Sequence, residues 1–72
     1  MKLFMWKNLE KVSIDDSNGL IVIADDLTHA YGILTKDEDI SNDSDVFHTE
    51  PYISVDIPQR SVEVIPFISL QN

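Results

Sequence analysis

Residues 20–34 read LIVIADDLTHAYGIL, and this stretch decides the fold. Its first five residues form an unbroken apolar run rich in β-branched side chains, which is typical of a central strand buried on both faces of a sheet. Asp25 and Asp26 follow, and a carboxylate at this point accepts hydrogen bonds from the free N–H groups of a helix's first turn. Four apolar residues then repeat at helical spacing and form one face: Leu27, Ala30, Tyr31 and Leu34. The sequence therefore predicts a strand followed by a short helix at about residues 26–35.

On the N-terminal side, residues 2–6 (KLFMW) are apolar and aromatic, which favours a first strand whose Phe4 and Trp6 share one face. Residues 7–14 are ambiguous, because Val12 and Ile14 alternate with polar residues and are compatible with a longer strand. A turn cluster ends at Asn18-Gly19, a pair that supplies the positive φ angles of a tight hairpin. We therefore expect a tight hairpin turn before the central strand.

On the C-terminal side, residues 52–57 alternate apolar and polar side chains as a half-buried strand does. A turn at 58–60 and a second alternating segment at 61–65 predict an antiparallel hairpin of these two strands. Pro66 cannot donate to a strand ladder, so segment 62–70 is expected at a sheet edge. The whole chain, residues 1–72, is predicted to be one small α+β domain with a mostly antiparallel sheet of three to five strands and one short helix packed on a face.

Residues 36–50 form a long polar, acidic loop without periodicity, a feature that usually means function or disorder. Residues 39–50 resemble a calcium-binding EF-hand loop, with Asp39 at position 1 and Glu50 at position 12. Position 6 is Ser44 where that loop has glycine, and Pro51 with a strand stands where it has a helix. The interpretation is an acidic solvated loop that binds divalent cations weakly, and no metal site or cofactor is assigned.

Charge is the strongest compositional feature, with 13 acidic and 5 basic residues giving −8. Residues 13–59 carry eleven acidic residues against Lys36 alone, which gives −10 for that segment. Such a field repels nucleic acids and anionic membranes and attracts basic proteins. The expected partner is therefore a basic protein or ribonucleoprotein complex that itself binds nucleic acid, with no direct binding of nucleic acid or membrane by this chain.

Catalysis is not expected. There is no cysteine, and the two glycines are too few for a phosphate-binding loop. No serine lies in a glycine-flanked nucleophile turn. The chain also has no apolar run near the roughly 20 residues that span a bilayer, so a cytoplasmic protein is expected.

The candidate partner-binding surface combines the acids around the helix start with those of the loop and one aromatic residue. Its members are Asp25, Asp26, Asp37, Glu38, Asp39, Asp43, Asp45, Phe47 and Glu50. If the loop is extended, carboxylates two residues apart lie about 7 Å apart, close to twice the phosphate spacing along a nucleic-acid strand. Phe47 either anchors a partner or folds back to hold the loop. His29 is spaced to pair with Asp25 or Asp26 on the helix.

In its acidic composition and small size, the chain resembles small acidic proteins of bacteriophages and other mobile elements, including anti-CRISPR and anti-restriction proteins. That resemblance implies a non-catalytic inhibitor that blocks a host nucleic-acid-binding defence complex with a surface that mimics nucleic acid. One alternative is an adaptor or immunity-type protein that binds through a sheet edge and apolar contacts. A second alternative is a weak divalent-cation-binding module, and a homodimer is also left open.

Overall fold

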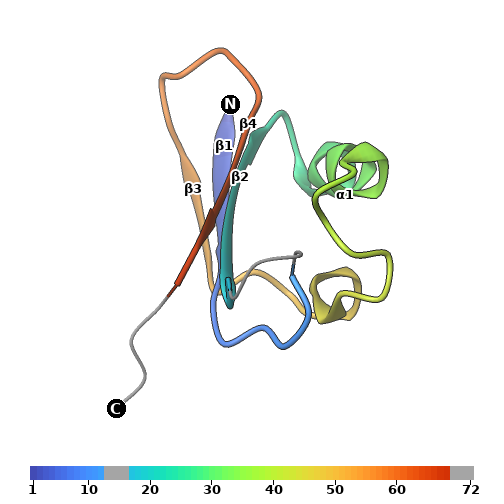
Figure 1. Ribbon diagram of the computed structural model, residues 1–72. Helices are drawn as coiled ribbons and strands as arrows, with labels where there is room; N and C mark the ends of the chain where they lie inside the picture. The colour runs from blue at the N-terminus through green and yellow to red at the C-terminus, as the bar shows by residue number, and fades with distance from the viewer. Residues whose placement is uncertain (13–16, 69–72) are drawn as a thin grey trace.

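The structure is a computed structural model that describes residues 1–12 and 17–68. In these residues one four-stranded antiparallel sheet carries α1 and the short 3-10 helix η1 on the same side (Figure 1). The prediction of a small α+β fold is confirmed. The elements are β1 (Lys2–Trp6), β2 (Gly19–Ala24), α1 (Leu27–Lys36), η1 (Asp45–His48), β3 (Ile53–Asp56) and β4 (Glu63–Phe67).

The apolar run forms the predicted central strand, since β2 pairs with β1 on one side and β4 on the other. The predicted tight turn at Asn18-Gly19 is wrong, because β1 and β2 are joined by the longer connection 7–18 and Gly19 is already the first residue of β2. In the described residues no glycine has a positive φ, and Asn8 (φ 59°) is the non-glycine that does. The possible strand extension to Ile14 falls partly on residues 13–16, outside the described residues.

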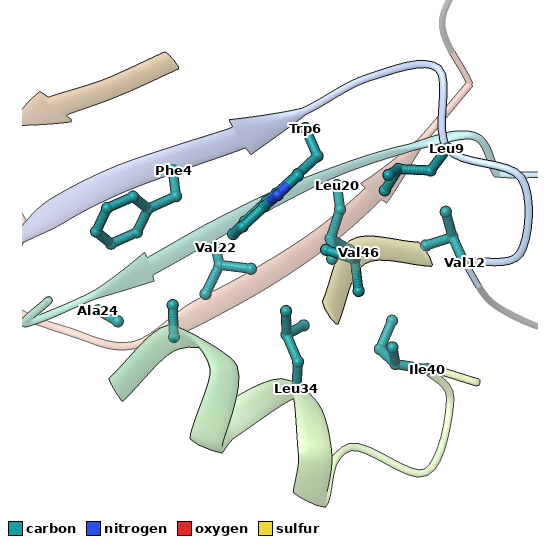
Figure 2. Close-up of a cluster of buried hydrophobic side chains, with 11 residues drawn as sticks. Phe4, Trp6, Leu9, Val12, Leu20, Val22, Ala24, Leu34, Ile40 and Val46 are labelled. Atoms are coloured by element: carbon teal, nitrogen blue, oxygen red, sulfur yellow. The ribbon is translucent and has the colours of Figure 1, made fainter. Parts of the chain in front are cut away.

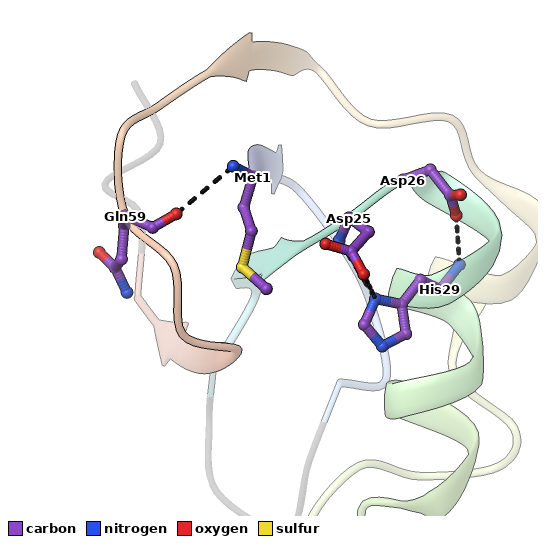
Figure 3. Close-up of polar contacts among 5 residues, drawn as sticks. All are labelled: Met1, Asp25, Asp26, His29 and Gln59. Atoms are coloured by element: carbon purple, nitrogen blue, oxygen red, sulfur yellow. Dashed lines mark hydrogen bonds and ion pairs between the residues drawn. The ribbon is translucent and has the colours of Figure 1, made fainter.

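The predicted hairpin of residues 52–57 and 61–65 is also wrong. The strand order is β3-β1-β2-β4, so β3 and β4 lie at opposite edges of the sheet. The link 57–62 instead runs past the end of β1, where the Ile57 N–H donates to the Met1 carbonyl (2.9 Å). The Met1 amino group donates to the carbonyls of Ile57 (3.2 Å) and Gln59 (3.4 Å), the latter drawn in Figure 3. The edge position predicted from Pro66 is confirmed for β4, while residues 69 and 70 lie outside the described residues.

The core lies between the sheet and the layer formed by α1, η1 and the loops (Figure 2). Phe4 and Trp6 share the inward face of β1, as predicted, with ring centroids 6.3 Å apart. From the helix side, Ala30 and Leu34 are fully buried against them. The other members of this buried cluster come from β2, from η1 and from the connecting segments: Leu20, Val22, Ala24, Leu9, Val12, Ile40 and Val46.

Gly19 is required by a contact and not by its backbone angles. The Phe67 ring of the neighbouring edge strand lies against its Cα, and an added Cβ would overlap three atoms of that ring. Gly32, on the exposed side of α1, has open space where its Cβ would be. An alanine would therefore clash with a neighbouring ring at position 19 and fit without a clash at position 32.

We predict that Gly19→Ala lowers the free energy of unfolding by about 1–3 kcal/mol, because the ring must leave its place. Gly32→Ala is predicted to raise it by up to about 1 kcal/mol through better helix propensity. Urea denaturation of both variants measures this. The cost of Gly19→Ala should shrink in a Phe67→Ala background, and an undiminished cost there would contradict the assigned contact.

Candidate functional site

The acidic side chains are distributed unequally over the two sides of the sheet. Of the 13 acidic residues, Asp15 and Asp16 lie outside the described residues, which leaves eleven. Among these eleven, Glu63 is the one whose register places it on the sheet face opposite the helix. The chain from residue 25 to residue 50 runs on the helix side of the sheet (Figure 1), and we call the predicted acids of this segment the acidic layer: Asp25, Asp26, Asp37, Glu38, Asp39, Asp43, Asp45 and Glu50.

At the start of α1, the predicted cap is confirmed and is provided by Asp26. Its Oδ1 accepts a hydrogen bond from the His29 N–H at 2.7 Å (Figure 3). The predicted Asp–His pair also forms, with His29 Nδ1 3.5 Å from Asp25 Oδ2. The same Nδ1 lies 3.1 Å from the Asp25 N–H, and one nitrogen cannot accept there and donate to the carboxylate at once. Asp26 thus shapes the helix start, while the Asp25 carboxylate stays exposed.

Along the loop at residues 36–50, two carboxylates accept hydrogen bonds from the backbone and four do not. Asp37 Oδ1 accepts from the Asp39 N–H (2.9 Å), and both oxygens of Asp45 accept from the Glu10 N–H (3.1 Å each). In the described part of the chain, the carboxylates of the other four loop acids make neither a hydrogen bond nor an ion pair. These four are the exposed residues Glu38, Asp39, Asp43 and Glu50. They are the loop charges that a partner can contact without disturbing the fold.

The loop is folded into turns, so the extended arrangement considered from the sequence is wrong. Turns at residues 38–39 and 42–43 replace the extended path on which the phosphate-like spacing depended. Ser44, which stands at the glycine position of the EF-hand pattern, has a different role in this structure. Its buried hydroxyl accepts a hydrogen bond from the Val46 N–H (3.2 Å) and caps η1. Within residues 1–12 and 17–68, no three His, Cys, Asp or Glu side chains converge as metal ligands would.

A row of four aromatic rings fixes the loop to the sheet. Successive ring centroids from Phe4 through Trp6 and Tyr31 to Phe47 lie 6.3, 6.0 and 6.3 Å apart. The Trp6 Nε1–H donates to the Thr49 carbonyl at 2.8 Å, and the Tyr31 hydroxyl donates to the same oxygen at 3.1 Å. Phe47 is partly buried against this row, so of its two predicted roles the structure shows the one that holds the loop.

A surface pocket of about 390 Å³ lies where the two ends of the acidic layer meet. Phe4 and Leu27 give it an apolar floor, and Asp26 and Glu50 add carboxylates. The other lining residues are Lys2, Pro51 and Ser54, and the Lys2 ammonium already pairs with Asp56 at 3.3 Å. This pocket could not be predicted from the sequence, because the pairing of β3 with β1 is what brings residues 50–54 beside Phe4. An apolar floor with carboxylates above it suits a lysine or arginine side chain.

Comparison of the chain with protein-family models, with curated proteins and with solved structures finds no match. In the described part of the chain, no helix has the length and apolar character needed to cross a membrane.

Ionisation of the Tyr31 hydroxyl makes the stability of the fold depend on pH. Burial of the phenol, and to a lesser degree the nearby negative charge of Glu50, raise the pKa of Tyr31 above its ordinary value of 10.0. A raised folded-state pKa means that the fold favours the neutral phenol. That contribution to stability is complete below the unfolded-state pKa and is lost as the pH rises through the raised folded-state pKa.

We predict that Tyr31→Phe reduces the decline in unfolding free energy between about pH 9 and about pH 11, where tyrosine titrates. Urea denaturation at several pH values in this range measures the slope. Tyr52→Phe is the matched control, because Tyr52 is 62% exposed and its hydroxyl has no such burial. Equal slopes for Tyr31→Phe and the unmodified protein would contradict the predicted linkage.

Proposed function

We propose that this protein is a non-catalytic inhibitor that binds the basic, nucleic-acid-holding surface of another protein with its acidic layer. The observation that carries the proposal is the uneven charge: a net charge of −8, with eight of the eleven acids of the described chain in residues 25–50, a segment that runs on the helix side of the sheet (Figure 1). The resemblance in composition to phage anti-defence proteins favours a host defence complex as the target.

The acidic layer supports this role because some of its acids hold the backbone in place while others remain free to contact a partner. Asp26, Asp37 and Asp45 use their carboxylates to hold the helix start and the loop. The exposed loop acids make no such bonds, and a charged surface of one sign speeds the encounter with a surface of the opposite sign. A rigid display of charge also loses less conformational entropy on binding than a disordered acidic tail does.

The pocket offers this interface an anchor. A lysine or arginine of the partner would lay its aliphatic stem on Phe4 and Leu27 and place its cationic group beside Asp26 and Glu50. Arginine is the better fit to paired carboxylate oxygens, because its planar group donates in a fork. Buried anchors of this kind mainly slow dissociation, whereas rim charges mainly speed association.

An adaptor that binds through apolar contacts is the second candidate function. The observation that favours it is the apolar sheet face opposite the helix, where Val55 is 45% exposed and Ile65 40% exposed. A protein partner on that face would bind independently of the acidic layer.

The test is capture of partners from a host lysate by the immobilised protein, followed by elution with free DNA or RNA. The captured protein is expected to be one that binds nucleic acid, to be released by nucleic acid, and to dissociate as salt rises. Glu38→Gln/Asp43→Asn is predicted to slow its association about threefold to tenfold, because two free charges of the acidic layer are lost.

The control is Glu63→Gln, which removes a charge from the sheet face opposite the helix and should leave the association rate nearly unchanged. Phe47→Ala is predicted to lower stability because Phe47 packs against Tyr31. A partner that keeps its nucleic acid while saturated with this protein would refute the proposed mode of inhibition.

A further inference from the structure

The sheet has a second apolar face, and no helix of the described residues packs on it. Both α1 and η1 lie on the other side of the sheet (Figure 1). By strand register, every residue of β1, β2 and β3 that points to this far face lacks a polar side chain, and in β4 the exception is Glu63. Three large side chains of the face are exposed, namely Ile53 (37%), Val55 (45%) and Ile65 (40%).

Such a face needs a cover for the same reason that the helix side does. A sheet that is apolar on both sides reaches its stable arrangement only when a second layer packs on each of them. The unbroken run of β2 has the pattern of a strand covered on both sides. In the single chain, the two far-facing isoleucines of this run differ: Ile23 is buried (4% exposed), whereas Ile21 is only partly buried.

We propose that a second copy of this chain covers the far face, so that two sheets pack face to face in a symmetric dimer. A C2 interface requires one patch that complements itself, and a flat apolar sheet face meets that requirement. The proposal does not depend on the function proposed above, since it concerns the opposite side of the molecule.

The charge distribution favours a second copy over the basic partner. A basic surface finds its complement on the acidic layer and gains no ion pairs on the apolar face. Sheets packed face to face lie about 10 Å apart, and each acidic layer stands behind its own sheet. The two layers are then separated by well over the roughly 8 Å Debye length at physiological salt, so a charge of −8 per chain does not prevent association.

Glu63 does not oppose this packing. It is the first residue of an edge strand, which puts it at a corner of the face, and its Oε2 accepts a hydrogen bond from Gln59 Nε2 at 3.0 Å. A carboxylate at a corner stays at the solvated rim of the dimer, where polar groups are usual.

The size of the face sets the expected strength. Four strands about 4.8 Å apart with about five residues each cover roughly 19 by 17 Å in projection. This is less than the about 800 Å² per partner of a standard interface. We therefore expect a weak dimer that dissociates on dilution.

Sedimentation velocity of the full chain from about 1 µM to about 1 mM tests the proposal. The average mass should rise from monomer to dimer, and higher salt should leave the dimer intact or strengthen it. This salt response is opposite to the one expected for the acidic layer. A chain that remains monomeric at about 1 mM would overturn the proposal and leave the face to another protein.

Val55→Lys should weaken the dimer at least about tenfold, because it places a charge in the interface. The control is Val62→Lys, since Val62 is equally exposed (45%) but lies in the link 57–62, outside the strands. Equal weakening by both variants would contradict the assigned face. Should Val55→Lys fail to fold, dilution of the unmodified protein in NMR decides instead. Concentration-dependent methyl shifts must then fall on Ile53, Val55 and Ile65, and shifts on the helix side would overturn the proposal.

Discussion

The hydrogen bond from the Trp6 indole to the Thr49 carbonyl is the interaction on which the rest of the structure depends. Trp6 is 1% exposed, and its N–H would be unsatisfied in the core without that carbonyl. A buried donor left without a partner costs about 1–3 kcal/mol, a large share of the stability of so small a domain. Because the Tyr31 hydroxyl shares the same acceptor, one oxygen connects the central sheet, the helix and the acidic loop.

This connection explains why so acidic a loop is folded. Ile40 and Val46 enter the core from it, and η1 brings Thr49 to the indole. The acids then point away from the core on a fixed backbone, and the opposite sheet face stays apolar. The chain therefore has two surfaces of different chemistry. Salt weakens binding at the acidic surface by screening its charges, and it does not weaken binding at the apolar surface. A 72-residue domain can present both because a single core layer separates them.

The parts of the fold that depend on local interactions could be predicted from the sequence. The run at 20–24, the cap at Asp26 and the edge position of Pro66 each follow from neighbouring residues. The parts that depend on distant contacts could not. Alternation in residues 52–57 fixes which side chains share a face but not which strand is the neighbour, and the predicted hairpin was wrong for that reason. Gly19 faces a ring 48 positions later in the sequence, and the pocket exists only because β3 pairs with β1.

The most direct test of this account is native-state hydrogen exchange of the Trp6 indole N–H, read by NMR. If that bond holds the acidic loop to the sheet, the indole proton exchanges as slowly as the β2 amides, because both need global unfolding to open. Exchange of the indole proton at the rate of an exposed amide, with β2 still protected, would contradict the account. It would show that the loop opens on its own, and that the acidic layer has no fixed shape.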